Sequence, residues 1–171
     1  MPLCLKSLQG LTADGVGSLA AVIYLAAMLG MGVCARQSDG SGRHARFLAA
    51  SMALACAGFC GVALALRNSA AVAVVVASFC VVACGIWGVM GPFWGLVPLQ
   101  FNKAEAPVGI ALVNSMGVAG SFAGPLVVAA LVGGSNNFIS AFAVSAILAA
   151  ASAAAAVAIP SQAVLLRPED V

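Results

Sequence analysis

Residues 106–166 read APVGIALVNSMGVAGSFAGPLVVAALVGGSNNFISAFAVSAILAAASAAAAVAIPSQAVLL, and this stretch decides the fold because it contains no Asp, Glu, Lys or Arg. Three further charge-free stretches cover residues 15–35, 47–66 and 68–102. A soluble domain carries about a quarter charged residues, whereas this chain of 171 residues has 7% charged and 63% hydrophobic residues. A membrane-spanning helix needs about 20 mostly apolar residues. The sequence therefore predicts an integral membrane protein.

The lengths of these stretches predict five membrane helices. The first two stretches are each one helix long, and the third fits one helix with an irregular end. The stretch at 106–166 is too long for one helix and is predicted to break at the polar run 133–137. The predicted fold class is thus an all-α membrane protein with five transmembrane helices, at about 16–35, 47–66, 70–99, 108–132 and 138–159. The predicted parts are an external segment (1–15), a five-helix membrane domain (16–160) and a tail (161–171).

The basic residues favour one side of the membrane. If the predicted helices alternate in direction, one side carries Arg36, Arg43, Arg46, Lys103 and Arg167. The other side carries only Lys6 and Arg67. The positive-inside rule then places the C-terminus in the cytoplasm of a multi-pass protein of the inner (plasma) membrane, with the N-terminus outside. Because residues 1–10 do not resemble a signal sequence, the chain reads as though it begins within a longer protein.

The composition speaks against several other classes of function. A net charge of +2 gives no electrostatic footprint for nucleic acid. Cys56 and Cys60, like Cys80 and Cys84, lie four residues apart on one helix face, but no His or carboxylate lies nearby to complete a metal site. We therefore interpret these cysteines as small packing residues. Without a nucleophile–base pair or a ligand cluster, no enzyme activity, cofactor or metal is predicted.

The glycines and prolines concentrate in the third and fourth predicted helices. Pro92 predicts a bend in the third helix. Gly120 and Gly124 have the spacing that lets two helix backbones approach closely, so we expect a helix–helix contact there. The Ala-rich second and fifth helices are predicted to be peripheral. Glycine and proline are also common in ordinary transmembrane packing, but broken helices additionally mark transporter binding sites.

Three segments carry a resemblance to a known family. The loop RQSDGSGR (36–43) resembles the loop between helices eight and nine of major facilitator superfamily transporters, in the anion:cation symporter branch of phthalate, tartrate and glucarate permeases. The run GPFW (91–94) resembles helix ten of that branch, and GIALVNSMG (109–117) with the later Gly-Pro pair at 124–125 resembles helix eleven. On this basis the five helices resemble helices eight to twelve of the major facilitator fold. Two departures are Gly40, where the family has a basic residue, and Cys34-Ala35, where it has a glycine.

The resemblance implies proton-coupled symport of a small organic anion, a carboxylate or a sugar acid, as two halves rock around a midplane site. It implies a gating loop formed by Arg36, Asp39 and Arg43, although a merely solvated loop is the alternative. His44, beside two arginines, is expected to be a loop or headgroup-level residue and not a switch. Asp39 is expected to need compensation from one of those arginines or from a neighbouring helix N-terminus. The candidate substrate-binding residues are Asn114 and Ser115 as hydrogen-bond donors, Trp94 and Phe93 as walls, and Tyr24.

Two hypotheses about the whole chain stay open. No predicted helix contains a charge, and intramembrane ionisable groups are what usually bind protons. A fragment of a transporter, inactive unless the missing half is supplied, is therefore the first hypothesis, with the lipid bilayer, the anion and protons as partners. The second is an intact small five-span protein that acts as a structural or interaction subunit through the face of Gly120 and Gly124. The sequence leaves a homo-oligomer open.

Overall fold

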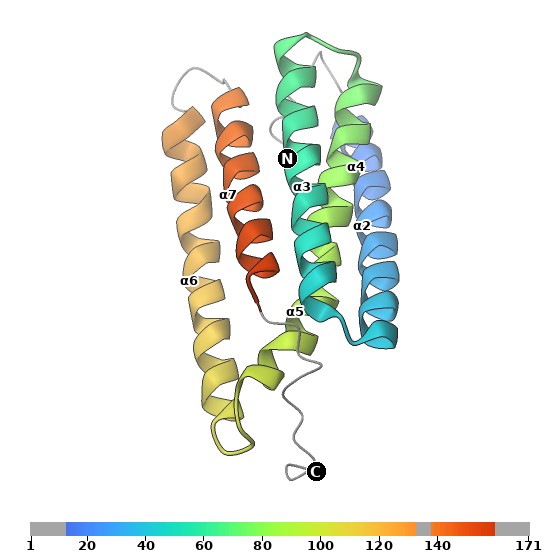
Figure 1. Ribbon diagram of the computed structural model, residues 1–171. Coiled ribbons are helices and arrows are strands. Elements are labelled where there is room, and N and C mark those ends of the chain that lie inside the picture. Colours follow the sequence, from blue (N-terminus) through green and yellow to red (C-terminus); the bar gives the residue numbers. More distant parts are fainter. Residues whose placement is uncertain (1–12, 133–137, 160–171) are drawn as a thin grey trace.

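The computed structural model describes residues 13–132 and 138–159, and this part of the chain is helical without strands. Figure 1 shows consecutive long helices running antiparallel to one another. Five helical segments are long and apolar enough to cross a membrane, which confirms the predicted fold class. The predicted break at 133–137 and nearly all of the predicted terminal segments lie outside the described residues. The elements are α2 (Ala13–Ser41), α3 (His44–Arg67), α4 (Val72–Gly88), α5 (Met90–Leu96), η1 (Val97–Gln100), α6 (Ala106–Val132) and α7 (Ile139–Val157).

The polar segment predicted as a loop at 36–46 is mostly helical. Helix α2 continues to Ser41, and the Ser41 hydroxyl donates to the carbonyl of Gln37 (2.8 Å), one turn back. Only Gly42, with φ of +63°, and Arg43 separate α2 from α3. The prediction of a loop over the whole of residues 36–46 was therefore wrong, because only two of these residues lie outside a helix. A transmembrane helix can continue past its apolar stretch, because polar residues outside the hydrocarbon core can also be helical.

The third predicted helix is broken, as the prolines suggested. Helix α4 ends at Gly88 and α5 begins at Met90, two residues before Pro92. Proline has no N–H, so the carbonyl of Gly88 cannot receive a helical hydrogen bond from Pro92. The next N–H, that of Phe93, donates to the carbonyl of Val89 (2.9 Å) and restarts the helix. Figure 1 shows α5 and η1 turning away from the axis of α4.

Helix α3 is central, which contradicts its predicted peripheral position. It packs against α2, α4, α5 and α7. Close approach between backbones explains this packing: a Cβ on Gly58 would lie 2.6 Å from the Val82 nitrogen, and a Cβ on Gly85 would lie 2.5 Å from the Ala55 nitrogen. The small side chains that make α3 look featureless are thus what admits neighbours on several sides. Its buried residues are Ala49, Ser51, Ala55, Gly58, Val62 and Ala65.

Helix α7 was also predicted to be peripheral, yet one face of it is well packed. It lies along α3 and buries alanines on that face, while Ile147 on another face is 67% exposed. Phe142 of α7 contributes an aromatic contact to the core, with its ring edge-on to Phe79 of α4 at a centroid distance of 5.5 Å. The alanines allow α7 to approach α3 closely, and Phe142 fixes its position against α4.

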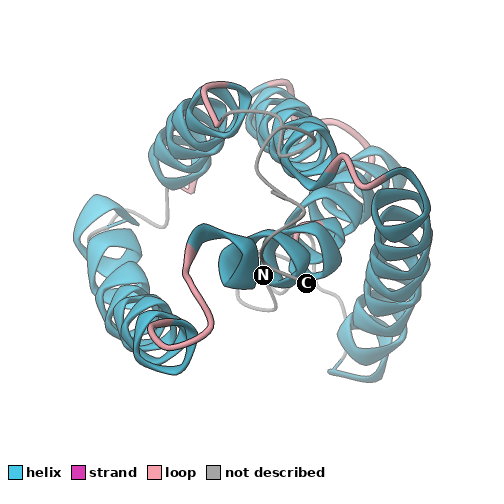
Figure 2. Cartoon of the chain, turned by 60° about the horizontal axis from the view of Figure 1, so that its bottom comes forward, coloured by secondary structure: helices cyan, strands magenta, loops and turns pink. Residues whose placement is uncertain are grey.

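Helix α6 stands apart from the other helices, as Figure 2 shows on the left of the view. Among the described elements it contacts only α7 and η1. No atom of another described segment lies within 4 Å of a Cβ built on Gly120 or Gly124, so the predicted close helix–helix contact is not made within this chain. Helix α7 packs along α3, and in the described part of the chain α6 reaches the bundle only through α7 and η1. Phe101 holds the start of α6, because its ring lies directly against Gly109.

The contrast between Gly85 and Gly117 yields a stability prediction. A side chain at Gly85 has no room beside Ala55, whereas a Cβ on Gly117 meets nothing within 4 Å. We expect Gly85→Val to lower the free energy of unfolding by about 1–3 kcal/mol, the usual cost of overpacking. The measurement is the unfolding midpoint of each purified variant in detergent, and Gly117→Val is the matched control. Equal destabilisation by both substitutions would contradict the packing described here.

Candidate functional site

A serine–histidine hydrogen bond organises the junction between α2 and α3. Ser38 is fully buried, and its hydroxyl lies 2.6 Å from Nδ1 of His44, the first residue of α3. The N–H of Gly42 donates to the carbonyl of Ser38 (2.9 Å), which closes the turn. His44 is half-buried and begins α3, so it is helical and not a loop residue, while the expectation of a headgroup-level position stays open. It connects the end of α2 to the start of α3.

A row of glycines on α4 and α5 packs against this junction. A Cβ on Gly95 would lie 2.9 Å from Nδ1 of His44, and a Cβ on Gly91 would lie 2.6 Å from Cβ of Ala35. A Cβ on Gly88 would lie 3.1 Å from Sγ of Cys34. We call Gly85, Gly88, Gly91 and Gly95 the glycine seam. The seam places the backbone of α4 and α5 directly against α2 and α3. Cys34 and Ala35, which stand where the resembled family has a glycine, contact this seam.

The three predicted gating residues lie around this junction at the surface. Arg36, Asp39 and Arg43 are all exposed. Asp39 belongs to the last turn of α2, and no ion pair joins it to Arg36 or Arg43 within the described part of the chain. The expected compensation by an arginine is therefore not made here, because the exposed carboxylate can be solvated by water instead. A gating role for these residues stays a prediction.

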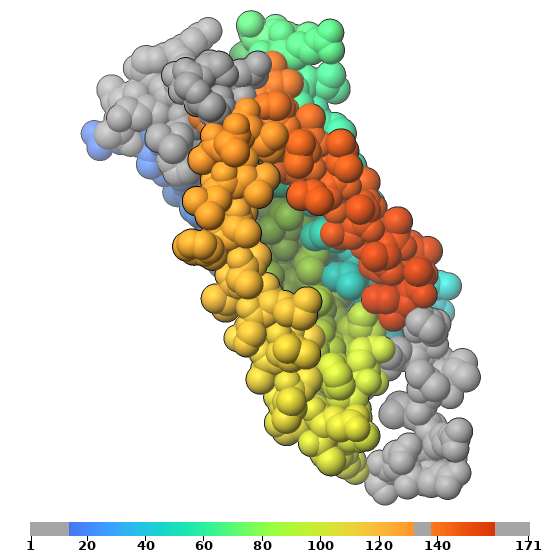
Figure 3. Space-filling model, turned by 90° about the vertical axis from the view of Figure 1, so that its left-hand side faces the viewer, coloured from blue at the N-terminus to red at the C-terminus, as the bar shows by residue number. Residues whose placement is uncertain are grey.

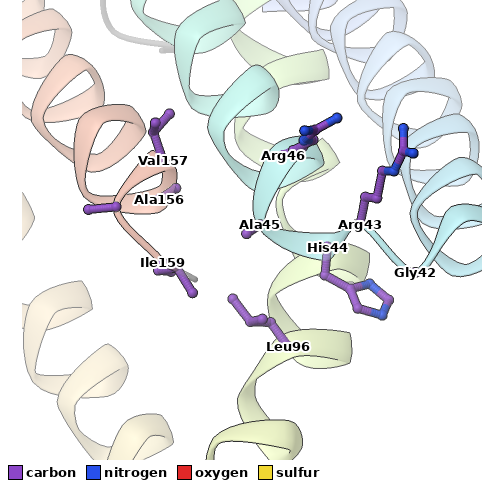
Figure 4. Close-up of a pocket in the computed structure, with 10 residues that line it drawn as sticks. Gly42, Arg43, His44, Ala45, Arg46, Leu96, Ala156, Val157 and Ile159 are labelled. Atoms are coloured by element: carbon purple, nitrogen blue, oxygen red, sulfur yellow. The ribbon is translucent and has the colours of Figure 1, made fainter. Parts of the chain in front are cut away.

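A cavity of about 400 Å³ adjoins the junction. Its walls are residues 42–46 at the start of α3, Leu96 of α5, and residues 156–159 at the end of α7. Figure 4 shows Ile159 and Leu96 facing the start of α3 across the cavity. Arg43 and Arg46 are among the lining residues, and in Figure 4 the Arg43 side chain extends away from the end of α7, while Leu96, Val157 and Ile159 supply apolar walls. The sequence drew attention to Arg43 but gave no sign that α7 would end beside it.

The predicted substrate-binding residues lie on separate surfaces. Asn114 and Ser115 are exposed on α6, where the Ser115 hydroxyl donates to the carbonyl of Ala111 (2.9 Å). Phe93 and Trp94 lie on α5 with nearly perpendicular rings, 5.3 Å between centroids. Tyr24 lies on α2 and is 60% exposed. Since α6 contacts neither α5 nor α2, the described chain does not bring these residues into one site.

Trp87 lies beside Tyr24 and was not predicted as a site residue. Tyr24, Met28 and Met31 of α2 form, with Trp87 of α4, a shallow hollow of about 180 Å³. Trp87 is 44% exposed. Its aromatic character was visible in the sequence, but its position opposite Tyr24 depends on the register between α2 and α4.

Cys34 and Cys84 pack against neighbouring helices, whereas Cys60 is exposed. The Cys84 thiol donates to the carbonyl of Ala26 (3.1 Å), and Cys84 lies against Gly30. The Cys34 sulfur lies 3.5 Å from the Ser51 hydroxyl. No group of His, Cys, Asp and Glu residues that could hold a metal ion occurs among residues 13–132 and 138–159.

A comparison with known proteins gives one informative similarity. Together with the five apolar helices, this similarity indicates a membrane protein related to transporters. The chain is similar to the "Putative tartrate transporter" of Agrobacterium vitis, with 32% identity over 116 residues. The aligned part covers 68% of this chain and 25% of that protein, so the chain spans about a quarter of its curated relative. No family model matches the sequence, and no solved structure matches it.

The hydrogen bond between Ser38 and His44 can be tested directly. Ser38→Ala removes the partner of His44 Nδ1 from a buried position, so we expect the free energy of unfolding to fall by about 1 kcal/mol. Ser41→Ala is the matched control, because that exposed hydroxyl bonds mainly to its own helix. Unfolding midpoints in detergent provide the measurement. A Ser41→Ala variant less stable than Ser38→Ala would argue against a structural role for the Ser38–His44 pair.

Proposed function

We propose that this chain is the C-terminal, five-helix part of a major facilitator-type symporter that takes up a small organic anion with protons. The similarity to the Agrobacterium vitis protein over 116 residues carries this proposal. The loop at 36–43, the run at 91–94 and the segment at 109–117 support it through their order and spacing. Tartrate or a related sugar acid is the substrate class that the name of the relative suggests.

The geometry is compatible with a protein that works together with further membrane helices. Asn114 on α6 and Tyr24 on α2 are exposed on surfaces that no described helix covers. In lipid, an exposed amide such as that of Asn114 is unfavourable unless protein or a water-filled cavity receives it. We therefore propose that additional helices complete a cleft against α2, α5 and α6. The proton-binding groups would then belong to those helices, because residues 15–35, 47–66, 68–102 and 106–166 contain no charge.

The arrangement of the helix ends supports the proposed orientation. In Figure 1 the α2–α3 turn, the connection between η1 and α6, and the C-terminal end of α7 all lie at one end of the molecule. Arg36, Arg43, Arg46 and Lys103 belong to that end, whereas Arg67 belongs to the opposite one. We propose that the arginine-rich end faces the cytoplasm of the inner membrane.

A second candidate function is a structural or interaction subunit. The observation that favours it is the open face of α6, where Gly120 and Gly124 have the spacing for a close helix contact but meet nothing within the described chain. On this proposal a helix of another protein, or of a second copy, would pack against α6. Transport activity separates the two candidates.

We expect the chain alone to transport nothing, because no described helix pair encloses the candidate substrate residues. Uptake of radiolabelled tartrate by cells that produce the chain should equal uptake by cells with empty vector. Co-expression with the part of the Agrobacterium vitis protein outside the alignment should raise uptake above that level. Immunoblots of membrane fractions provide the expression control. Uptake by the chain alone would overturn the need for further helices, and no uptake in either case would favour the second candidate.

Reporter fusions test the orientation. We expect alkaline phosphatase fused after Arg67 to be active and a fluorescent protein fused after Val171 to fluoresce, since these positions flank an odd number of the proposed membrane crossings. The reciprocal fusions serve as controls. An active phosphatase at Val171 together with an inactive one at Arg67 would reverse the proposed orientation.

A further inference from the structure

The cavity beside the α2–α3 junction combines positive charge with apolar walls. Arg43 and Arg46 are among its lining residues and are exposed. Neither forms an ion pair with a carboxylate anywhere in the described ranges, 13–132 and 138–159. The start of α3 has no side-chain cap, so its first backbone N–H groups add further positive potential at the same place. This end of the cavity favours an anion.

The opposite side of the cavity favours hydrocarbon. Leu96 of α5 is buried, and Val157 at the end of α7 is 75% exposed. Figure 3 shows that the surface is hollowed between α6 and α7, with α3 and α5 visible beneath. The lining of the cavity itself comes from the α2–α3 turn, the start of α3, α5 and the end of α7, with no residue of α6. An acyl chain would find apolar surface here.

The cavity lies at the depth of lipid headgroups. Helix α3 has 24 residues, which corresponds to about 36 Å of length against a hydrocarbon core of about 30 Å. Arg43 and Arg46 border the charge-free residues 47–66, and Arg67 borders them at the other end. From these lengths we infer that the arginines at the cavity lie near the phosphates of one leaflet. Basic pockets between membrane helices at this level are a recurring binding site for anionic lipid headgroups.

We propose that this cavity binds one anionic phospholipid, with its phosphate between Arg43 and Arg46 and its acyl chains along the end of α7. Charge-assisted hydrogen bonds from two guanidinium groups to one phosphate would be stronger than hydrogen bonds between neutral groups. The apolar walls give a lipid an advantage over free phosphate, which offers nothing to Leu96 or Val157. The inference does not depend on the proposed transport function.

Binding of phosphatidylglycerol to the purified full chain in detergent tests this proposal. Native mass spectrometry would compare phosphatidylglycerol with phosphatidylcholine, and inorganic phosphate would be added as a competitor. We expect retention of phosphatidylglycerol over phosphatidylcholine and little displacement by phosphate. The double variant Arg43→Gln/Arg46→Gln should bind phosphatidylglycerol about 10- to 30-fold more weakly, on the basis of about 1 kcal/mol for each arginine. Arg67→Gln, at the other end of α3, is the matched control and should bind like the parent.

Several outcomes would overturn the proposal. Equal loss in Arg67→Gln and in the double variant would mean that lipid responds to overall charge and not to this cavity. Equal retention of phosphatidylcholine would remove the requirement for an anionic headgroup, and full displacement by inorganic phosphate would indicate a free-anion site. If the double variant does not fold, a photoactivatable phosphatidylglycerol on the unmodified chain decides. Cross-links at residues 43–46 and 156–159 would support the site, and cross-links only elsewhere would overturn it.

Discussion

Close contact between helix backbones is the constraint on which this structure depends. Lipid gives helices no hydrophobic reason to associate, so association depends on van der Waals contact, and contact requires small residues. The glycine seam supplies them on one span, and the alanines of α3 and α7 supply them on two others. Gly85 fits against Ala55, and Gly58 fits against Val82, with no room for another carbon at either position. The position of the α2–α3 junction, and with it the arginine-lined cavity, follows from these contacts.

Charge and length were sufficient to predict the fold class. The absence of charged residues over four stretches predicted five apolar helices, and Pro92 predicted the break in the third. The lateral arrangement could not be predicted in the same way. Alanine and glycine are equally compatible with a lipid-facing helix and with a tightly packed one, so α3 was expected outside and lies at the centre. Conversely, Gly120 and Gly124 have a packing spacing, but whether a neighbour is present depends on where α7 lies.

The candidate site was less predictable than the fold. The motif at 36–43 directed attention to charged residues, yet the specific contact at that junction is made by Ser38 and His44. A hydrogen bond across a turn depends on where α2 ends, and the sequence suggested an end several residues too early. Trp87 and Tyr24 meet only because α2 and α4 share a particular register. The residues considered for substrate binding lie on α2, α5 and α6, and their separation reflects the isolated position of α6.

The glycine seam also has a consequence for how α5 is held in the bundle. When side chains of two helices interdigitate, the helices must separate before one can shift along the other. Gly91 and Gly95 have no side chain to interdigitate with Ala35 and His44, so at these two positions the backbone of α5 lies directly against the ends of α2 and α3. The break at Pro92 also separates α5 from the axis of α4. At Gly91 and Gly95 the lower part of the third span thus meets α2 and α3 without interlocking side chains, and the buried Pro92 and Leu96 are what fix α5 in place.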